Sequence, residues 1–207
     1  MSARFLVVDL GGVVCRFDHA HRLDRLARAC ALSPDEIDAR LWRSGFSADC
    51  DRGRYGSAAQ VRTRIRAVLA ATGGDDNLDD DLDDAWCSAF RPDEGVLDAL
   101  DRHRGDRVLA LLTDNGPLEE EALTRRYPEV FARFDHLFFS HRLGRRKPDP
   151  AVFAAVTGHL GAPGAAVVFV DDSPANVAAA REAGWHGIRY QDVPRLRRDL
   201  REAAGRT

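Results

Sequence analysis

The chain has 207 residues, of which 44% are hydrophobic and 30% are charged, and its formal net charge is −3. This length fits one domain carrying an insert, or two small lobes, and the composition is ordinary for a soluble globular protein. The small negative charge excludes a general attraction to nucleic acid or acidic membranes, and no apolar run approaches the ~20 residues that span a bilayer.

The first predicted element is a buried strand over residues 4–8, which ends abruptly at Asp9 and is followed by a glycine pair. From about residue 15 to residue 90, helical periodicity replaces the strand signals. Helices are expected over residues 21–31, from residue 33 (a capping box with proline in first position), from residue 57, and over residues 79–90. We interpret this block as a small α-helical insert.

After residue 91, helices and strands alternate. Helices are expected over residues 92–103, 117–126, 150–160, 174–183 and 193–203, and strands over residues 107–112, 136–139, 166–170 and 185–190. Such alternation predicts an α/β fold, a doubly wound parallel sheet with helices on both faces. Because the first strand precedes the insert, the α/β core is predicted to comprise residues 1–15 and 91–207, with the helical insert at residues 16–90.

The four cysteines, Cys15, Cys30, Cys50 and Cys87, show neither paired nor metal-type spacing. Reduced thiols are therefore expected rather than a disulfide framework. The N-terminal residues lack the long apolar core of a signal peptide. Together these features favour a cytoplasmic protein.

Polar side chains follow the ends of four predicted strands. They are Asp9 and Gly11 after the first strand, Thr113 and Asp114 after the second, Lys147 after the third, and Asp171 and Asp172 after the fourth. In an open parallel sheet, ligands bind beyond the carboxyl ends of the strands. Singly, each residue is ordinary, because an aspartate after a strand is commonly a turn residue and a lysine is commonly a solvated charge. All four groups in order are hard to reach by chance, and they predict one site.

The three acids of this site repel one another. Two unit charges 4 Å apart repel by about 4 kcal/mol at an effective dielectric constant near 20, so protonation or a cation is required. All-oxygen ligands with room for water and phosphate suit Mg²⁺, and zinc is disfavoured because His141 is the only His or Cys nearby. A phosphate would complete the arrangement, held by Mg²⁺, by Thr113 and by Lys147. Lys147 is the only lysine among 30 basic residues, which hints that a compact ammonium is needed there.

Four segments carry a resemblance to a known family. The pieces FLVVDLGGVV, LALLTDNG, RRKPDP and VVFVDDSPANVAAAREAG resemble the motifs of the haloacid dehalogenase superfamily of hydrolases, in order and over nearly the whole chain. The helical insert stands where that family carries its cap. The DLGxV start and the helical cap are similar to those of bacterial glucose-1-phosphatase-like members. The resemblance implies a Rossmann-like core with a helical cap.

The resemblance also implies roles for individual residues. Asp9 would be the nucleophile that forms an aspartyl-phosphate, and also a metal ligand. Asp171, Asp172 and the carbonyl of Gly11 would complete the Mg²⁺ site, and Thr113 and Lys147 would bind the phosphoryl group. The expected activity is Mg²⁺-dependent hydrolysis of a small phosphorylated metabolite, by a monomer or homodimer with no nucleic-acid or membrane partner.

Two positions depart from the family pattern. Most phosphatases of the superfamily carry a second aspartate, the general acid and base, where Gly11 stands here. Such a group is typically worth about 10²–10⁴-fold in rate, so its absence favours better leaving groups, as in anomeric sugar, acyl or aryl phosphates. His19 or a residue of the cap could instead supply the proton. At the second position, Asp114 replaces an asparagine, and it must point away from phosphate, be protonated, or recognise part of the substrate.

Other functions remain open from the sequence. A haloacid dehalogenase also uses an aspartate nucleophile, but it usually carries tyrosine at the position of Gly11 and needs no acidic pair at residues 171–172. A phosphomutase normally keeps the second aspartate. A catalytically weak binding or regulatory protein would explain both departures. Five residues of the insert are candidate substrate selectors, or else packing residues: Trp42, Phe46, Asp51, Arg52 and Tyr55.

Overall fold

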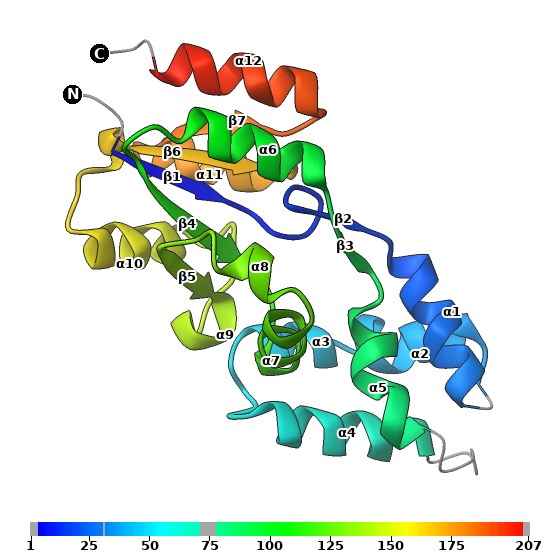
Figure 1. Cartoon of the computed structure of the whole chain (residues 1–207). Coiled ribbons are helices and arrows are strands. Elements are labelled where there is room, and N and C mark those ends of the chain that lie inside the picture. The colour runs from blue at the N-terminus through cyan, green and yellow to red at the C-terminus, as the bar shows by residue number, and fades with distance from the viewer. Residues whose placement is uncertain (1–3, 31, 71–77, 205–207) are drawn as a thin grey trace.

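The centre of the fold is a five-stranded sheet in the order β5-β4-β1-β6-β7 (Figure 1). The computed structural model describes residues 4–30, 32–70 and 78–204. All neighbouring strands of this sheet are parallel, which confirms the predicted topology. The strands are β1 (Phe5–Val8), β4 (Val108–Thr113), β5 (His136–Phe139), β6 (Val167–Asp171) and β7 (His186–Arg189). The strand order reverses between β1 and β6, which is where such sheets open a crevice for ligands.

The strands form because their side chains are apolar on both faces. The four residues of β1 and the five of β6 are all buried, as expected for strands that helices cover on two sides. Successive side chains point to opposite faces, so Leu6 and Val8 join one apolar cluster while Phe5 and Val7 join the other. The sheet therefore lies between two separate cores.

Helices cover both faces of the sheet (Figure 1). The larger core contains buried side chains of α6 (Glu94–His103), α7 (Pro117–Arg126), α8 (Pro128–Phe131) and α12 (Val193–Ala204). The other core contains those of α10 (Pro150–Leu160) and α11 (Pro174–Glu182). The elements α7, β5 and α10 begin and end where the sequence predicts. Three short helices, α8, α9 (Ser140–Leu143) and η2 (Gly164–Ala166), were not predicted, since one turn gives no periodic signal.

The described residues between positions 18 and 89, here called the helical segment, are mainly helical and lie beyond one end of the sheet (Figure 1). The helices are α1 (His19–Ala29), α2 (Pro34–Asp38), the π-helix η1 (Ala39–Arg43), α3 (Phe46–Asp51), α4 (Ala58–Ala70) and α5 (Leu78–Cys87). The predicted capping box is confirmed: the Ser33 N–H donates to Glu36 Oε2 at 2.9 Å, and the Glu36 N–H donates to Ser33 Oγ at 3.3 Å. The sequence did not predict η1 or α3.

The expectation that strands are absent between residues 15 and 90 was wrong at both ends. A connecting ribbon of two antiparallel strands, β2 (Cys15–Phe17) and β3 (Phe90–Pro92), carries the chain out of the sheet region and back. Three-residue strands are too short to show an alternating pattern, and their partners stand far apart in the sequence. The predicted boundaries at residues 15/16 and 90/91 fall within this ribbon, and the division into core and cap stays a prediction.

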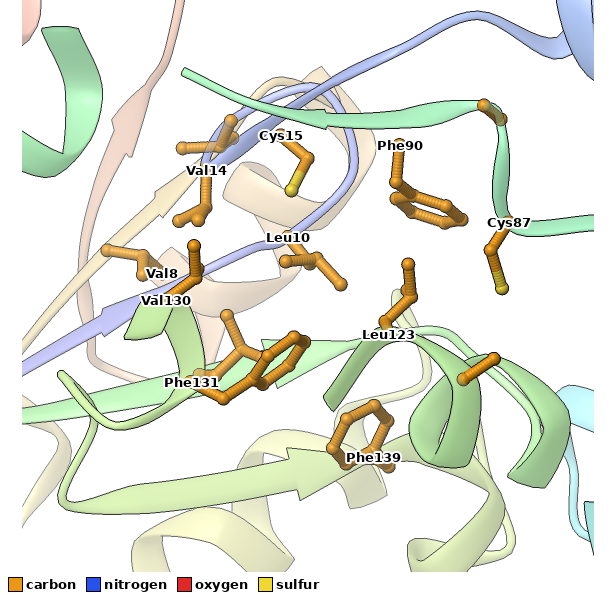
Figure 2. Close-up of a cluster of buried hydrophobic side chains, with 14 of the residues drawn as sticks. Val8, Leu10, Val14, Cys15, Cys87, Phe90, Leu123, Val130, Phe131 and Phe139 are labelled. Carbon is orange, nitrogen blue, oxygen red and sulfur yellow. The ribbon is translucent and has the colours of Figure 1, made fainter. Parts of the chain in front are cut away.

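The loop after β1 is fixed by apolar anchors. Leu10 and Val14 are fully buried and gather with Phe131 and Phe139 in one cluster (Figure 2). These contacts hold the backbone on both sides of Gly11 and Gly12. Over the part of the chain that the structure describes, no helix has the length and apolar character to cross a bilayer.

Candidate active site at the carboxyl edge of the sheet

Asp9 is positioned by the tight loop that follows β1. Its N–H donates to Val170 O of β6 at 2.9 Å, which continues the sheet by one residue. Gly12 has a φ of +87°, and a Cβ at this position would lie 2.5 Å from Asp172 Oδ2. Only glycine accommodates both the left-handed backbone and this close approach. The loop therefore brings Asp9 beside the acids that follow β6.

Three carboxylates converge at this point. Asp9, Asp171 and Asp172 each offer an oxygen, and these oxygens lie within 4.8 Å of one another. Asp171 is fully buried, and its Oδ1 accepts the Ser173 N–H at 2.9 Å and the Asn176 Nδ2 at 3.0 Å. An all-oxygen cluster of this kind suits a hard divalent cation such as Mg²⁺. The structure thus brings together the three acids that the sequence analysis selected, and Gly11 lines the cavity beside Asp9.

Lys147 lies between two of these acids. Its ammonium nitrogen is 2.8 Å from Asp9 Oδ1 and 2.7 Å from Asp171 Oδ2, and it donates to Leu112 O at 3.0 Å. All three donors of the ammonium are thereby used, and the residue is 6% exposed. A planar guanidinium could not occupy the same position. This arrangement accounts for the single lysine in an otherwise arginine-only set of basic residues.

Burial sets the electrostatics of the cluster. Burial, together with the charges of Asp171 and Asp114, outweighs the lowering effect of Lys147 and raises the pKa of Asp9 to about 7. Burial, followed by the Asp171 charge, also raises the pKa of Asp172. Burial opposes the charge of Lys147, but the surrounding carboxylates outweigh burial and raise the pKa of its ammonium. The site therefore has more negative charge than one ammonium neutralises, and a divalent cation would relieve the excess.

The end of β4 adds a hydroxyl and a fourth acid. Thr113 is 1% exposed, and its Oγ1 accepts the Asn115 Nδ2 at 2.6 Å, so its hydroxyl proton remains available to an acceptor in the cavity. Asp114 Oδ1 accepts the Lys147 backbone N–H at 3.0 Å, and its Oδ2 lies 4.0 Å from Arg146 Nε. Burial raises the pKa of Asp114. Its carboxylate is thus tied to the loop that carries Lys147.

A cavity of about 260 Å³ opens at these residues. Its lining combines strand-end residues with side chains of the helical segment, among them Arg22, Trp42 and Asp51. Of the candidate selectors, Trp42 and Asp51 line this cavity. Phe46 and Tyr55 pack against each other with ring centroids 5.3 Å apart, and Arg52 donates to Ala48 O, so these three are not part of its lining.

Two aromatic rings lie close to Gly11, the position where most phosphatases of the superfamily carry a second aspartate. A Cβ on Gly11 would lie 3.2 Å from the Phe90 ring and 3.5 Å from the Phe17 ring. His19, one suggested substitute, has its Nε2 3.0 Å from Asp38 Oδ1 and its ring against Trp42, outside the cavity lining. Asp51 does line the cavity. Burial, followed by the charge of Glu119, raises the pKa of Asp51 well above its usual range.

Sequence reasoning missed three charged residues of the cavity: Arg22, Glu119 and Arg146. Arg22 and Glu119 are each 3% exposed. Arg22 was hidden among 29 arginines, although its spacing from Leu26 places both on one buried helical face. Glu119 lies in the first turn of α7, where an acidic residue is ordinarily explained by the helix dipole. Arg146 directly precedes Lys147, which was the stronger signal.

The chain is similar to known proteins both in sequence and in fold. Residues 4–184 match the family model described as haloacid dehalogenase-like hydrolase. A HAD family enzyme from Bacteroides thetaiotaomicron, crystallised with magnesium and inorganic phosphate, is similar over 92% of this chain and 95% of that one, with a TM-score of 0.75 and 23% identity. This likeness concerns the fold.

Two curated relatives are similar over shorter stretches. The chloroplast flavin mononucleotide hydrolase 1 of Arabidopsis thaliana is 41% identical over 63 residues, 30% of this chain. A sesquiterpene phosphatase of Aspergillus oryzae is 30% identical over 116 residues, 56% of this chain. The matched stretches span 26% and 59% of these two proteins.

Proposed function

Because this chain belongs to the haloacid dehalogenase-like hydrolase family, we propose that it is a Mg²⁺-dependent phosphatase of small phosphate monoesters, with Asp9 as nucleophile. The observation that carries this proposal is the position of Asp9, within 4.8 Å of two further carboxylates and 2.8 Å from the Lys147 ammonium, at the mouth of a cavity. The names of the relatives, a flavin mononucleotide hydrolase and a sesquiterpene phosphatase, support phosphate-ester chemistry.

A nucleophilic Asp9 would divide the hydrolysis into two steps. The Asp9 carboxylate attacks phosphorus, the ester bond breaks, and an acyl phosphate forms on Asp9 as the alcohol leaves. Water then attacks the same phosphorus and restores the free carboxylate. The Thr113 hydroxyl orients the phosphoryl group, and the Lys147 ammonium, which contacts Asp9, offsets its negative charge. Asp9, Asp171, Asp172 and the Gly11 carbonyl would hold Mg²⁺, which supplies Lewis-acid neutralisation of the phosphoryl charge when bound.

The leaving alcohol must receive a proton. Gly11 has no carboxyl group, and a Cβ there would lie in close contact with the Phe90 ring, at 3.2 Å. Asp51 is the acid of the helical segment that lines the cavity, and burial, followed by the charge of Glu119, raises its pKa well above its usual range, which favours the protonated form. We place the proton donor there, and we place residues 16–90 in the role of a substrate-selecting cap. Sugar 1-phosphates and aryl phosphates, which leave more easily, are the substrates least dependent on this donor.

The test is turnover of p-nitrophenyl phosphate with Mg²⁺. The wild type should release nitrophenol, and EDTA or Asp9→Asn should abolish release. Asp98→Asn is the matched control, because Asp98 is an exposed acid paired with Arg102 on α6. A wild type inert toward a broad panel of phosphate esters would instead indicate a binding or regulatory protein. Release of halide from 2-haloacids without Mg²⁺ would indicate a dehalogenase.

A further inference from the structure

We propose that Arg22 and Glu119 form a recognition pair for the leaving group, and that this group is a compact, uncharged alcohol with several hydroxyls. The inference rests on the proposed phosphatase function and specifies the substrate class of the same cavity. Arg22 belongs to α1 of the helical segment, and Glu119 belongs to α7 beside the sheet. Both line the cavity over Asp9, and both are almost completely buried.

Aromatic rings hold the Arg22 guanidinium in place, but two of its nitrogen atoms make no hydrogen bond within the described residues. Its guanidinium carbon lies 5.2 to 5.5 Å from the centroids of four aromatic rings, those of Phe17, Trp42, Trp86 and Phe90. These rings stabilise the positive charge and fix the plane of the group. Its Nε and Nη2 nevertheless have no hydrogen-bond partner among the residues that the structure describes. Buried donors of this kind are rarely left unpaired, so a ligand is expected to use them.

Glu119 is likewise held in place and, as far as the structure describes the chain, it has an unpaired acceptor where Arg22 has unpaired donors. Its Oε1 accepts the Trp86 indole N–H at 2.6 Å, which fixes the carboxylate between α5 and α7. Its Oε2 is buried and has no hydrogen-bond partner within the described ranges. Across those same ranges, Glu119 Oε2 makes no hydrogen bond to Arg22, although both residues line the cavity. The described residues that line the cavity therefore include one with two unpaired buried donors and another with an unpaired buried acceptor.

This pairing selects hydroxyl groups. A guanidinium only donates and a carboxylate only accepts, so a ligand that satisfies both must carry acceptors and donors. An alcohol with several hydroxyls does so, because each hydroxyl both donates and accepts. A hydrocarbon leaving group would leave both residues unsatisfied. Sites built to bond a hydroxyl reject analogues that lack it by as much as about 10⁴–10⁵-fold.

The charges and the volume of the cavity narrow the class of leaving group further. An anionic leaving group attracted by Arg22 would meet the carboxylates of Glu119 and Asp114, and a cationic one would meet Arg22 and Arg146. The volume of about 260 Å³ lies below the roughly 300–1,000 Å³ of pockets that hold drug-sized ligands. The rings of Phe17, Trp42 and Phe90 offer apolar surface to the C–H face of a small ring. These features suit a sugar or cyclic polyol and not a flavin, a nucleotide or a long isoprenoid.

The experiment compares esters matched in size but not in hydroxyl content. The wild type with Mg²⁺ is assayed on inositol and hexose phosphates, on cyclohexyl phosphate, and on p-nitrophenyl phosphate. We expect kcat/KM for the best polyol phosphate to exceed that for cyclohexyl phosphate by about 100-fold or more. Glu119→Gln and Arg22→Met should each reduce this ratio by about tenfold or more. The controls Glu121→Gln on α7 and Arg28→Met on α1 keep the ratio, since both residues lie outside the cavity.

The outcomes distinguish a failure of the proposed phosphatase function from a failure of the proposed recognition pair. Lack of turnover of every ester, p-nitrophenyl phosphate included, would overturn the proposed function itself. Turnover with no preference for hydroxylated esters, or with flavin mononucleotide or isoprenyl phosphates as best substrates, would overturn only the recognition pair. Equal losses on all esters in both variants would also overturn it, because they would indicate a structural role. Should a variant fail to fold, the substrate ratio of the wild type and competitive inhibition by the free polyol decide the question.

Discussion

The Lys147 ammonium nitrogen lies 2.7 Å from Asp171 Oδ2, a carboxylate with no exposed surface. The same nitrogen is 2.8 Å from Asp9 Oδ1, so one buried cation ties the end of β1 to the end of β6. These two strands flank the point where the strand order of the sheet reverses. The contact therefore fixes Asp9, the proposed nucleophile, relative to the acids with which it would share a metal.

Replacement of Lys147 should greatly reduce activity, even when the new residue keeps the positive charge. We expect Lys147→Met to lower kcat/KM for p-nitrophenyl phosphate by about 10²–10³-fold or more, as when one preorganised charge-stabilising donor is removed. Lys147→Arg should not restore activity, because the enclosed position has no room for a planar fork. Arg145→Lys, an exposed neighbour paired with Asp149, is the control and should be neutral. Full activity of Lys147→Arg would contradict this account.

Metal affinity should depend on pH through Asp9. Because the pKa of Asp9 is raised to about 7, this carboxyl holds its proton at lower pH, and a cation must displace it. Mg²⁺ affinity should therefore rise with pH through about 7, and binding below that value should release protons. Isothermal titration calorimetry in buffers of different ionisation enthalpy measures both quantities. Asp9→Asn should remove the pH dependence. Affinity that is constant across this range would count against Asp9 as a ligand.

The proposed proton donor predicts a dependence on the leaving group. Asp51→Asn should lower kcat/KM for alkyl phosphates by about 10²–10⁴-fold, while acetyl phosphate, whose leaving group needs no proton, should lose far less. Asp49→Asn, on the same helix and paired with Arg54, is the control. The measurement is a plot of log kcat/KM against leaving-group pKa, which should steepen in the variant. An unchanged slope would remove Asp51 from this role.

Asp114→Asn tests the acid beside the phosphoryl site. The substituted amide oxygen can still accept the Lys147 N–H, so the loop should stay in place while one negative charge disappears. We expect inhibition by inorganic phosphate to tighten by about threefold to tenfold, because repulsion between partly buried charges amounts to a few kcal/mol at most. The inhibition constant against p-nitrophenyl phosphate measures this. No change would mean that the carboxylate is fully neutralised by its present partners.

The attachment of α3 to the sheet region can be tested with two glycines. Gly53 and Gly45 both have positive φ, +76° and +87°, but a Cβ on Gly53 would lie 2.3 Å from His141 O, whereas one on Gly45 meets nothing within 4 Å. Each alanine should cost roughly 1–2 kcal/mol for the left-handed backbone. Gly53→Ala should cost about 1–3 kcal/mol more, through overpacking. Urea unfolding of both variants measures the difference, and equal losses would show that α3 can move aside.

The sequence predicted those parts of the molecule that local pattern controls. Continuous apolar strands fixed the sheet, and the acids that follow them were placed correctly because parallel strands share one carboxyl edge. The connecting ribbon was missed, since the pairing of Phe17 with Phe90 joins residues far apart in the chain. Arg22 and Glu119 were missed for a related reason. Their burial arises only when α1 and α5 close over α7, and no local pattern carries that information.

The in-register pairing of Phe17 with Phe90 has a consequence for how such a protein can diversify. The chain leaves and returns at adjacent points, so residues 18–89 could be exchanged for another module without changing the spacing of the ends that receive it. Phe17 and Phe90 would stay with the sheet region and still line the cavity beside Asp9. Arg22 and Asp51 would be replaced together with the module. Grafting between family members would then transfer the residues that contact the leaving group, while Asp9, Lys147 and the acids after β6 stay in their original frame.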